Sequence, residues 1–194
     1  MIKTLRYMRH GQTVFNERGI WQGRADSPLS AMGIAQARAT RAYFAGLPTP
    51  IDHVYCSPLG RVIQTLEEAL PEIGKNYVVD PKLIEMSFGE VDGTPIAGEA
   101  TDYERYDFSQ IGGEREETAG ERTCRALERI MNRTGNVNVL AVGHGGTGRY
   151  FYKRWRELSQ VAFDEALPNC SVATYTYDTN TRTFSCIDIL IPKV

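Results

Sequence analysis

The chain has 194 residues, of which 42% are hydrophobic and 24% charged, and its formal net charge is −2. This composition is typical of a globular protein and excludes a mainly disordered chain. A nearly neutral charge provides no global field for nucleic acid or an anionic membrane, so any anion site must be built locally. The length suits one domain, and we expect residues 1–194 to form it.

Cysteine spacing and hydropathy indicate the compartment. The four cysteines, at positions 56, 124, 170 and 186, show neither CxxC spacing nor the density of a disulfide scaffold. Reduced, buried thiols are therefore expected. The first residues lack the apolar core of a signal peptide, and no apolar run approaches the ~18 residues that a membrane span needs. We therefore expect a cytoplasmic protein.

In the first half of the chain, predicted strands alternate with predicted helices. A strand over residues 4–8 is followed by a glycine-containing loop, and Ser30 can cap a helix that runs to about residue 47. The run His53–Cys56 predicts a second strand. Ser57 and Pro58 then predict an N-cap and a first helical position. The following apolar stripe is typical of a helix packed on a sheet, and it consists of Val62, Leu66, Ala69 and Ile73.

The second half continues the alternation. A short strand over 77–79 precedes a polar, ambiguous segment at 93–118. The elements expected after it are a helix over 119–132, a fully buried strand over 137–142, a helix carrying Phe151, and a hairpin formed by 172–177 and 184–191. The pattern predicts an α/β fold. We expect a three-layer α/β/α sandwich with a mostly parallel central sheet and a C-terminal antiparallel hairpin.

Two of the three histidines stand where predicted strands end. His10 lies between Arg9 and Gly11 after the first strand, and His144 lies between two glycines after the strand over 137–142. In open α/β sheets, ligands bind at the carboxyl ends of strands near a switch in strand order. One strand-end histidine is usually structural, but two such histidines can converge on one crevice. We therefore predict a site that contains both.

Two other readings of these residues are weaker. His53 and Cys56 could suggest half of a zinc site, but their odd spacing in a strand puts them on opposite faces. We therefore expect no metal. Residues 143–148 match GxGxxG, which is typical of dinucleotide-binding oxidoreductases. The expected acidic strand end does not follow, and too little chain remains for a nucleotide-binding half.

Several motifs together indicate a family. They are Arg9-His10-Gly11-Gln12-Thr13 with Asn16, Gln22-Gly23, Pro28-Leu29-Ser30 with Gly33, Ser57-Pro58-Leu59-Gly60-Arg61, Leu83 and Glu85 with Phe88-Gly89, and His144-Gly145-Gly146. In these motifs and their order, the chain resembles the histidine phosphatase superfamily, which has a phosphoglycerate-mutase-like fold. Two positions differ from the usual pattern: Phe15 stands where tryptophan is common, and Gly113-Glu114-Arg115 stands where many members have Gly-Glu-Ser.

The resemblance assigns roles to these positions. It implies that His10 is the nucleophile that becomes phosphorylated, that Arg61 grips the phosphoryl group, and that Glu85 is the general acid and base. His144 is implied as the second catalytic histidine, and a protonated ring would stabilise the transferring charge. The implied substrate-binding residues are Arg9, Asn16, Gln22, Gly23, Arg61, His144 and Gly145. Taken alone, Arg61 could equally be a solvated helix residue, and Glu85 a surface carboxylate.

The residue types at these positions suit phosphoryl transfer. A phosphomonoester carries nearly two negative charges, and arginine side chains offer directional donors to its oxygens. An unprotonated ring nitrogen of His10 can attack phosphorus if the other nitrogen is held as N–H. A cluster of arginines would lower the pKa of that histidine. Gly11 would let the backbone approach the anion.

We therefore expect a phosphatase that hydrolyses small phosphomonoesters through a phosphohistidine, with no cofactor and with a small phosphorylated metabolite as its partner. Mutases of the family that the chain resembles usually carry a longer insertion between the acid/base segment and the second histidine. Here Glu85 and His144 are only 144 − 85 = 59 positions apart, so the resemblance implies a compact phosphatase rather than the alternative, a cofactor-dependent phosphoglycerate mutase. An inactive module that binds phospho-ligands is a further alternative, and a homodimer is left open. The acidic segment 93–118 is either a substrate-selecting cap, which would disfavour highly anionic substrates, or a solvated loop.

Overall fold

The computed structural model describes residues 1–96, 107–163 and 167–194. Its six strands form a mixed sheet in the order β3-β2-β4-β1-β5-β6. The strands are β1 (Ile2–Arg9), β2 (His53–Cys56), β3 (Val78–Val79), β4 (Asn138–Gly143), β5 (Val172–Asp178) and β6 (Thr183–Leu190). The first four pair in parallel, whereas β5 runs antiparallel to β1, and β6 runs antiparallel to β5. The predicted mostly parallel sheet with a C-terminal hairpin is thus confirmed.

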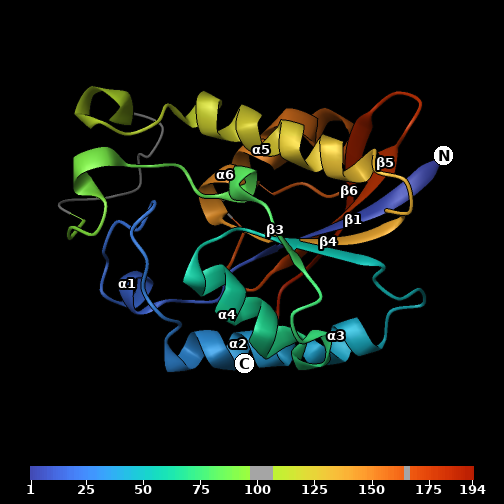
Figure 1. Cartoon of the computed structure of the whole chain (residues 1–194), viewed down its shortest axis with the longest axis horizontal. Coiled ribbons are helices and arrows are strands. Elements are labelled where there is room, and N and C mark those ends of the chain that lie inside the picture. The colour runs from blue at the N-terminus through green and yellow to red at the C-terminus, as the bar shows by residue number, and fades with distance from the viewer. Residues whose placement is uncertain (97–106, 164–166) are drawn as a thin grey trace.

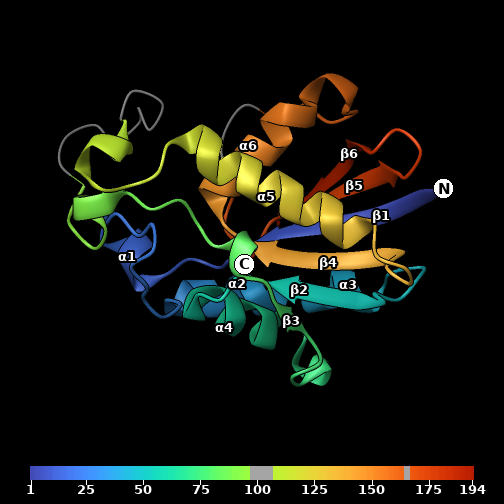
Figure 2. The same ribbon diagram turned by 45° about the horizontal axis from the view of Figure 1, so that its top comes forward.

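Helices cover both faces of the sheet (Figure 1). The helices α2 (Ala31–Ala39), α3 (Arg41–Ala45) and α4 (Gly60–Ala69) lie on one face, and α5 (Glu116–Met131) and α6 (Gly145–Trp155) lie on the other. Figure 2 shows the same separation from a second direction. Shorter elements occupy the connections: α1 (Val14–Glu17), η1 (Pro71–Ile73), η2 (Pro81–Leu83), η3 (Gly89–Val91), η5 (Phe108–Ile111) and η6 (Arg156–Leu158). Together these layers form the predicted sandwich.

Each face of the sheet has its own apolar core, as the alternation of side chains along a strand requires. Leu5 and Tyr7 of β1 belong to the cluster under α5 and α6, and Met8 belongs to the cluster under α2 and α4. A third cluster, built from Met86, Phe88, Phe108 and Ala119, lies outside both. It supports the loops beyond the carboxyl ends of the strands.

Two helix boundaries differ from the prediction. The expected helix from Ser30 to residue 47 is two helices, because the Thr40 hydroxyl donates to the Ala37 carbonyl at the end of α2. Such local side-chain bonds compete with helix continuation. The helix expected to begin at residue 119 begins at Glu116. Among the described residues, no helix is long and apolar enough to cross a membrane.

Part of the expected cap at 93–118 lies outside the described residues, namely 97–106, which include Asp102 and Tyr103. In the described part, η5 brings Phe108 into the third cluster, where its side chain is buried. Whether the whole segment acts as a cap stays a prediction.

Candidate active site

The sheet brings two histidines together at the carboxyl ends of neighbouring strands. Arg9 pairs with Gly143 in the parallel register of β1 and β4, and the His10 backbone N–H donates to the Gly143 carbonyl at 3.0 Å. The rings of His10 and His144 therefore face each other, with centroids 5.4 Å apart and planes inclined at 65°. Both residues are buried. The predicted convergence of the two histidines is observed.

The His10 ring is held in one tautomer. Its Nδ1 lies 2.8 Å from the Gly11 carbonyl oxygen, which can only accept, so Nδ1 carries the proton and Nε2 keeps its lone pair. Burial, followed by the nearby Arg61 and Arg9 charges, lowers the pKa of His10 well below its usual range. The ring lines a cavity. His10 is thus a neutral imidazole with an unprotonated nitrogen at a cavity wall.

His144 has a different set of partners. Arg61 Nη2 donates to its Nδ1 at 3.2 Å, and its Nε2 lies 2.7 Å from Ser57 Oγ. Burial and the Arg61 charge lower the pKa of His144 well below its usual range, so the ring is neutral rather than protonated. The Tyr7 hydroxyl fixes its backbone, accepting from the His144 N–H and donating to its carbonyl. Among the described residues His144 does not line the cavity, and its contact with substrate stays a prediction.

Arg61 is buried, at 1% exposure, which rules out a solvated helix residue. Its Nη1 donates to the Ala25 carbonyl and to Asp26 Oδ1, and its Nη2 donates to the Gly23 carbonyl and to His144. Nε is buried without a hydrogen-bond partner in the described part of the chain. Because the four Nη hydrogens are engaged, Nε–H is the donor that remains for a ligand in the adjoining cavity.

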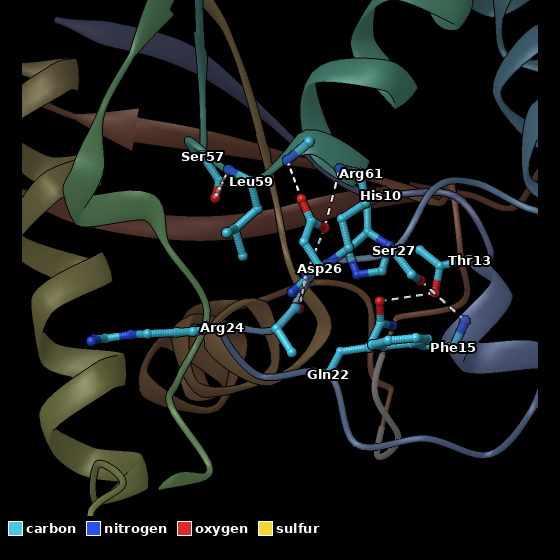
Figure 3. Close-up of polar contacts among 12 residues, drawn as sticks. His10, Thr13, Phe15, Gln22, Arg24, Asp26, Ser27, Ser57, Leu59 and Arg61 are labelled. Atoms are coloured by element: carbon cyan, nitrogen blue, oxygen red, sulfur yellow. Dashed lines mark hydrogen bonds and ion pairs between the residues drawn. The ribbon is translucent and has the colours of Figure 1, made fainter. Parts of the chain in front are cut away.

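The first turn of α4 is capped by a distant residue (Figure 3). Asp26 accepts from the Gly60 N–H at 2.5 Å and from the Arg61 N–H at 3.4 Å. The prediction that Ser57 caps this helix, with Pro58 as its first residue, is wrong: the N-cap is Leu59, and its side chain makes no capping bond. The carboxylate of Asp26 thus occupies the anion-attracting end of α4.

Glu85 caps α6 in the same way. Its Oε2 accepts from the Gly146 N–H at 3.0 Å, and its Oε1 accepts from the N–H groups of Thr147 and Met86 at 3.0 and 2.9 Å. Glu85 is only 7% exposed, so it is not a surface carboxylate. These bonds also engage N–H groups of the GxGxxG match that would otherwise face a dinucleotide diphosphate.

The backbone around Glu85 is held by Arg122 of α5. Arg122 Nη1 donates to the Ile84 carbonyl at 2.7 Å and Nη2 to the Glu85 carbonyl at 3.4 Å, while Nη2 also contacts Glu114 Oε2 at 3.1 Å. Glu114 in turn accepts from the Ser87 N–H and pairs with Arg24. Arg122 and Glu114 thus fix the segment that carries Glu85.

Three predicted binding residues come from the loop after β1. Thr13 caps α1 in a capping box, in which its N–H donates to Asn16 Oδ1 at 3.1 Å. The Thr13 hydroxyl also donates to Gln22 Oε1 at 2.9 Å (Figure 3). Both amide oxygens are therefore engaged, which leaves the amide nitrogens as donors for the cavity that Asn16, Gln22 and Gly23 line. Gly23 has φ +47°, and a Cβ there would collide with Asp92.

The glycines beside the histidines serve packing. A Cβ on Gly11 would lie 2.7 Å from the Gly33 carbonyl oxygen of α2, so this glycine lets α2 approach the strand end. Whether it also lets the backbone approach the anion stays a prediction. A Cβ on Gly145 would lie 3.0 Å from Arg9 Cζ. Gly145 therefore leaves space for Arg9, whose Nη1 donates to the Leu167 carbonyl.

The cavity has a volume of about 290 Å³. Its lining includes eight of the nine predicted site residues, namely Arg9, His10, Asn16, Gln22, Gly23, Arg61, Glu85 and Gly145. Among the described residues, no group of three or more His, Cys, Asp or Glu side chains could hold a metal ion. The four cysteines are buried and unpaired, and burial raises the pKa of Cys170 to about 12.

Comparison with known proteins decides the family. The profile of the histidine phosphatase superfamily (branch 1) matches residues 5–189. The chain belongs to this superfamily. A Hydrogenobacter thermophilus protein named "Putative phosphoserine phosphatase 2" is 42% identical over 47% of the chain, which covers only 44% of that protein. "Probable phosphoglycerate mutase GpmB" from Yersinia enterocolitica is 34% identical over 71% of the chain and 67% of its own length.

The fold agrees with this membership. The crystal structure of phosphoglycerate mutase from Bacillus anthracis superposes with a TM-score of 0.81, covering 96% of this chain and 92% of that one at 22% identity. At this identity the likeness concerns the fold. The superfamily thus includes relatives named as phosphatases and as mutases, and their names leave the reaction of this member open.

The sequence did not predict the roles that four residues have at the site. Ser57 was interpreted as a helix cap, and Tyr7 as an ordinary strand residue, although both contact His144. Asp26 and Arg122 carried no local signal, because each acts on residues more than thirty positions away. The only hint was Asp26 itself, a carboxylate in a glycine-containing loop close to Gln22 and Gly23.

Proposed function

We propose that this superfamily member is a phosphatase that hydrolyses small phosphomonoesters through a phosphohistidine on His10. The observation that carries the proposal is the state of the His10 ring. Its Nδ1 is held as N–H by the Gly11 carbonyl, and burial with two arginines lowers its pKa, so that Nε2 is unprotonated at the cavity wall. A nucleophilic histidine requires that combination.

The first half-reaction transfers the phosphoryl group. His10 Nε2 attacks phosphorus, and the bond from phosphorus to the ester oxygen breaks. Arg9, Arg61 Nε–H and the amide nitrogen of Asn16 stabilise the phosphoryl oxygens, because preorganised donors favour the developing charge. Glu85 lies at the same cavity and supplies the proton to the leaving alcohol.

The second half-reaction restores the enzyme. Glu85, now without that proton, takes one from a water molecule as the water attacks phosphorus. The bond between phosphorus and His10 Nε2 breaks, and inorganic phosphate leaves. One carboxyl group thus serves first as acid and then as base.

Labelling with a ³²P-phosphomonoester tests the proposal. We expect His10→Ala to abolish both turnover and the acid-labile labelled protein. Glu85→Gln should slow turnover of an ester with a poor leaving group by about 10²–10⁴ and leave labelled protein trapped. His53→Ala, which removes an exposed histidine at the start of β2, is the matched control and should behave as wild type. Wild-type turnover in His10→Ala would overturn the proposal, and phosphate release from no ester at all would favour a binding module.

A phosphoglycerate mutase is the second candidate, and the name of the Yersinia enterocolitica relative favours it. The two activities share a phosphohistidine and differ in whether water or a hydroxyl accepts the phosphoryl group. Incubation with 3-phosphoglycerate and a trace of 2,3-bisphosphoglycerate separates them. We expect free phosphate to appear, and the formation of 2-phosphoglycerate would favour the mutase.

A further inference from the structure

The cavity changes character away from His10. Arg9, Arg61, Glu85 and the N-terminus of α6 line the end beside His10, where the phosphoryl group is expected. Of the residues that the structure describes, six in the remaining lining have apolar side chains, which are Ile20, Trp21, Met86, Phe88, Ile96 and Ala119. The leaving group of a substrate would lie against these residues, since the phosphoryl end is occupied by the polar set.

The apolar part of the cavity rests on the third cluster. The Trp21 ring packs edge-on against Phe88 and Phe108, with centroids 5.1 and 5.7 Å apart, and Phe88 packs against Phe108 at 4.8 Å. Met86 and Phe88 are only 5% and 6% exposed. Interlocked rings of this kind form a preformed wall, and a preformed apolar wall favours a ligand that is itself apolar and planar.

Two charged side chains in this region of the cavity form an ion pair with each other. Glu116 and Arg149 both line the cavity, and Arg149 Nη2 donates to Glu116 Oε1 at 2.8 Å. A leaving group that carries a carboxylate would have to compete with Glu116 for Arg149 and would approach a like charge. Breaking a partly buried pair leaves one charge without its partner, which is costly. An uncharged leaving group avoids this cost.

The size of the cavity restricts the substrate further. Its volume of about 290 Å³ lies just below the roughly 300–1,000 Å³ that small-molecule sites usually occupy. This space suits a phosphoryl group and a single small ring better than an extended nucleotide.

We propose that the preferred substrates are phosphomonoesters of uncharged, apolar ring alcohols, in preference to phosphorylated acids such as phosphoglycerates. This inference rests on the proposed phosphatase function. Trp21 and Phe88 bind the ring, and the Glu116–Arg149 pair disfavours an additional carboxylate. Trp21 and Glu116 are thereby specificity-determining residues.

A panel of alkyl esters with similarly poor leaving groups tests the ranking on the wild-type protein. Benzyl phosphate supplies the apolar ring, glycerol 3-phosphate an uncharged polar group, 3-phosphoglycerate an acid, and phosphoserine a zwitterion. We expect kcat/KM for benzyl phosphate to exceed that for 3-phosphoglycerate by at least about tenfold. An equal or higher value for 3-phosphoglycerate or phosphoserine would overturn this inference alone, whereas no phosphate release from any ester would overturn the proposed function.

Two variants with matched controls locate the preference. Trp21→Leu should raise KM for benzyl phosphate about tenfold and change inhibition by inorganic phosphate less than twofold, since phosphate alone does not reach the ring. Trp155→Leu removes a tryptophan of α6 that packs on Phe184 and should leave both values near wild type.

Glu116→Gln should raise the ratio of kcat/KM for 3-phosphoglycerate to that for benzyl phosphate several-fold. Glu121→Gln, which removes another carboxylate of α5, one that pairs with Arg154 of α6, should not. An unchanged KM in Trp21→Leu, or an unchanged ratio in Glu116→Gln, would contradict the assignment of that residue.

Discussion

Ser57 Oγ lies 2.7 Å from His144 Nε2, and both side chains are fully buried. Because His144 Nδ1 accepts from Arg61, Nε2 carries the ring proton and donates it to the serine. Ser57 therefore fixes the ring that in turn fixes the guanidinium of Arg61. A serine that follows β2 directly thus positions an arginine on the helix after it.

Removing this hydroxyl should weaken the hold on Arg61. In Ser57→Ala, the Nε2–H of His144 loses its acceptor, which typically costs about 1–3 kcal/mol. We expect kcat/KM to fall about tenfold, inhibition by inorganic phosphate to weaken, and the ¹⁵N signals of the His144 ring to change. Ser171→Ala is the control, since its buried hydroxyl donates to the Pro168 carbonyl rather than bonding to a histidine ring. A Ser57→Ala enzyme that matched this control in all three measurements would exclude the positioning role.

The two buried histidines should make folding stability depend on pH. Their pKa values lie well below the usual range in the folded protein, so both rings stay neutral there, whereas in the unfolded chain they titrate near 6.5. As pH falls below about 6.5, the unfolded state binds protons that the folded state does not, so stability is lost. The loss should approach about 1.4 kcal/mol per pH unit for each ring.

Urea unfolding at pH 7.5, 6.5 and 5.5 measures this dependence. His10→Asn should reduce the slope by about 1.4 kcal/mol per pH unit, because one of the two rings is gone. His53→Asn removes a solvent-exposed ring instead and should retain the wild-type slope. If His10→Asn kept the full slope, the acid sensitivity would come from other groups.

Much of the scaffold was predictable because the periodicity of apolar residues and the residue types at strand ends indicate its strands and helices. The apolar run before His144 predicted β4, and the recurrence of a histidine at two strand ends predicted their meeting. Parallel neighbours present their carboxyl ends at one edge of a sheet, so this inference needs no knowledge of the loops.

The predictions that failed concern contacts between residues distant in the sequence. Ser57 before Pro58 is a good local capping signal, but the tertiary structure uses its hydroxyl for His144, and Asp26 caps α4 instead. Glu85 likewise caps α6 across a long stretch of sequence. Local propensity describes neither bond, because each depends on how a loop folds back on a helix end.

Arg122 should act on catalysis through Glu85. Because its guanidinium holds the Ile84 and Glu85 carbonyls, Arg122→Met should let the Glu85 carboxyl group, the proposed general acid and base, shift away from the leaving oxygen. We expect kcat to fall about tenfold with KM within about twofold, which steady-state kinetics on one ester can resolve. Arg122→Lys should restore only part of the rate, since a lysine cannot reproduce the fork of donors. Arg125→Met, on the exposed face of α5, is the control. A change confined to KM would argue that Arg122 affects substrate binding instead.

Asp26 places a negative charge beside Arg61 while capping α4. In Asp26→Asn the side-chain oxygen can still accept from Gly60, but the charge that opposes a bound phosphate is gone. We expect inorganic phosphate to inhibit about threefold to tenfold more tightly, which corresponds to about 0.7–1.4 kcal/mol. Stability should fall by roughly 0.5–1 kcal/mol because the carboxylate no longer complements the helix dipole. Asp80→Asn is the matched control, since Asp80 also caps a helical turn and pairs with an arginine, but that arginine, Arg129, is not among the described residues that line the cavity. Weaker inhibition in Asp26→Asn alone would show instead that the charge is needed to hold Arg61 in its binding position.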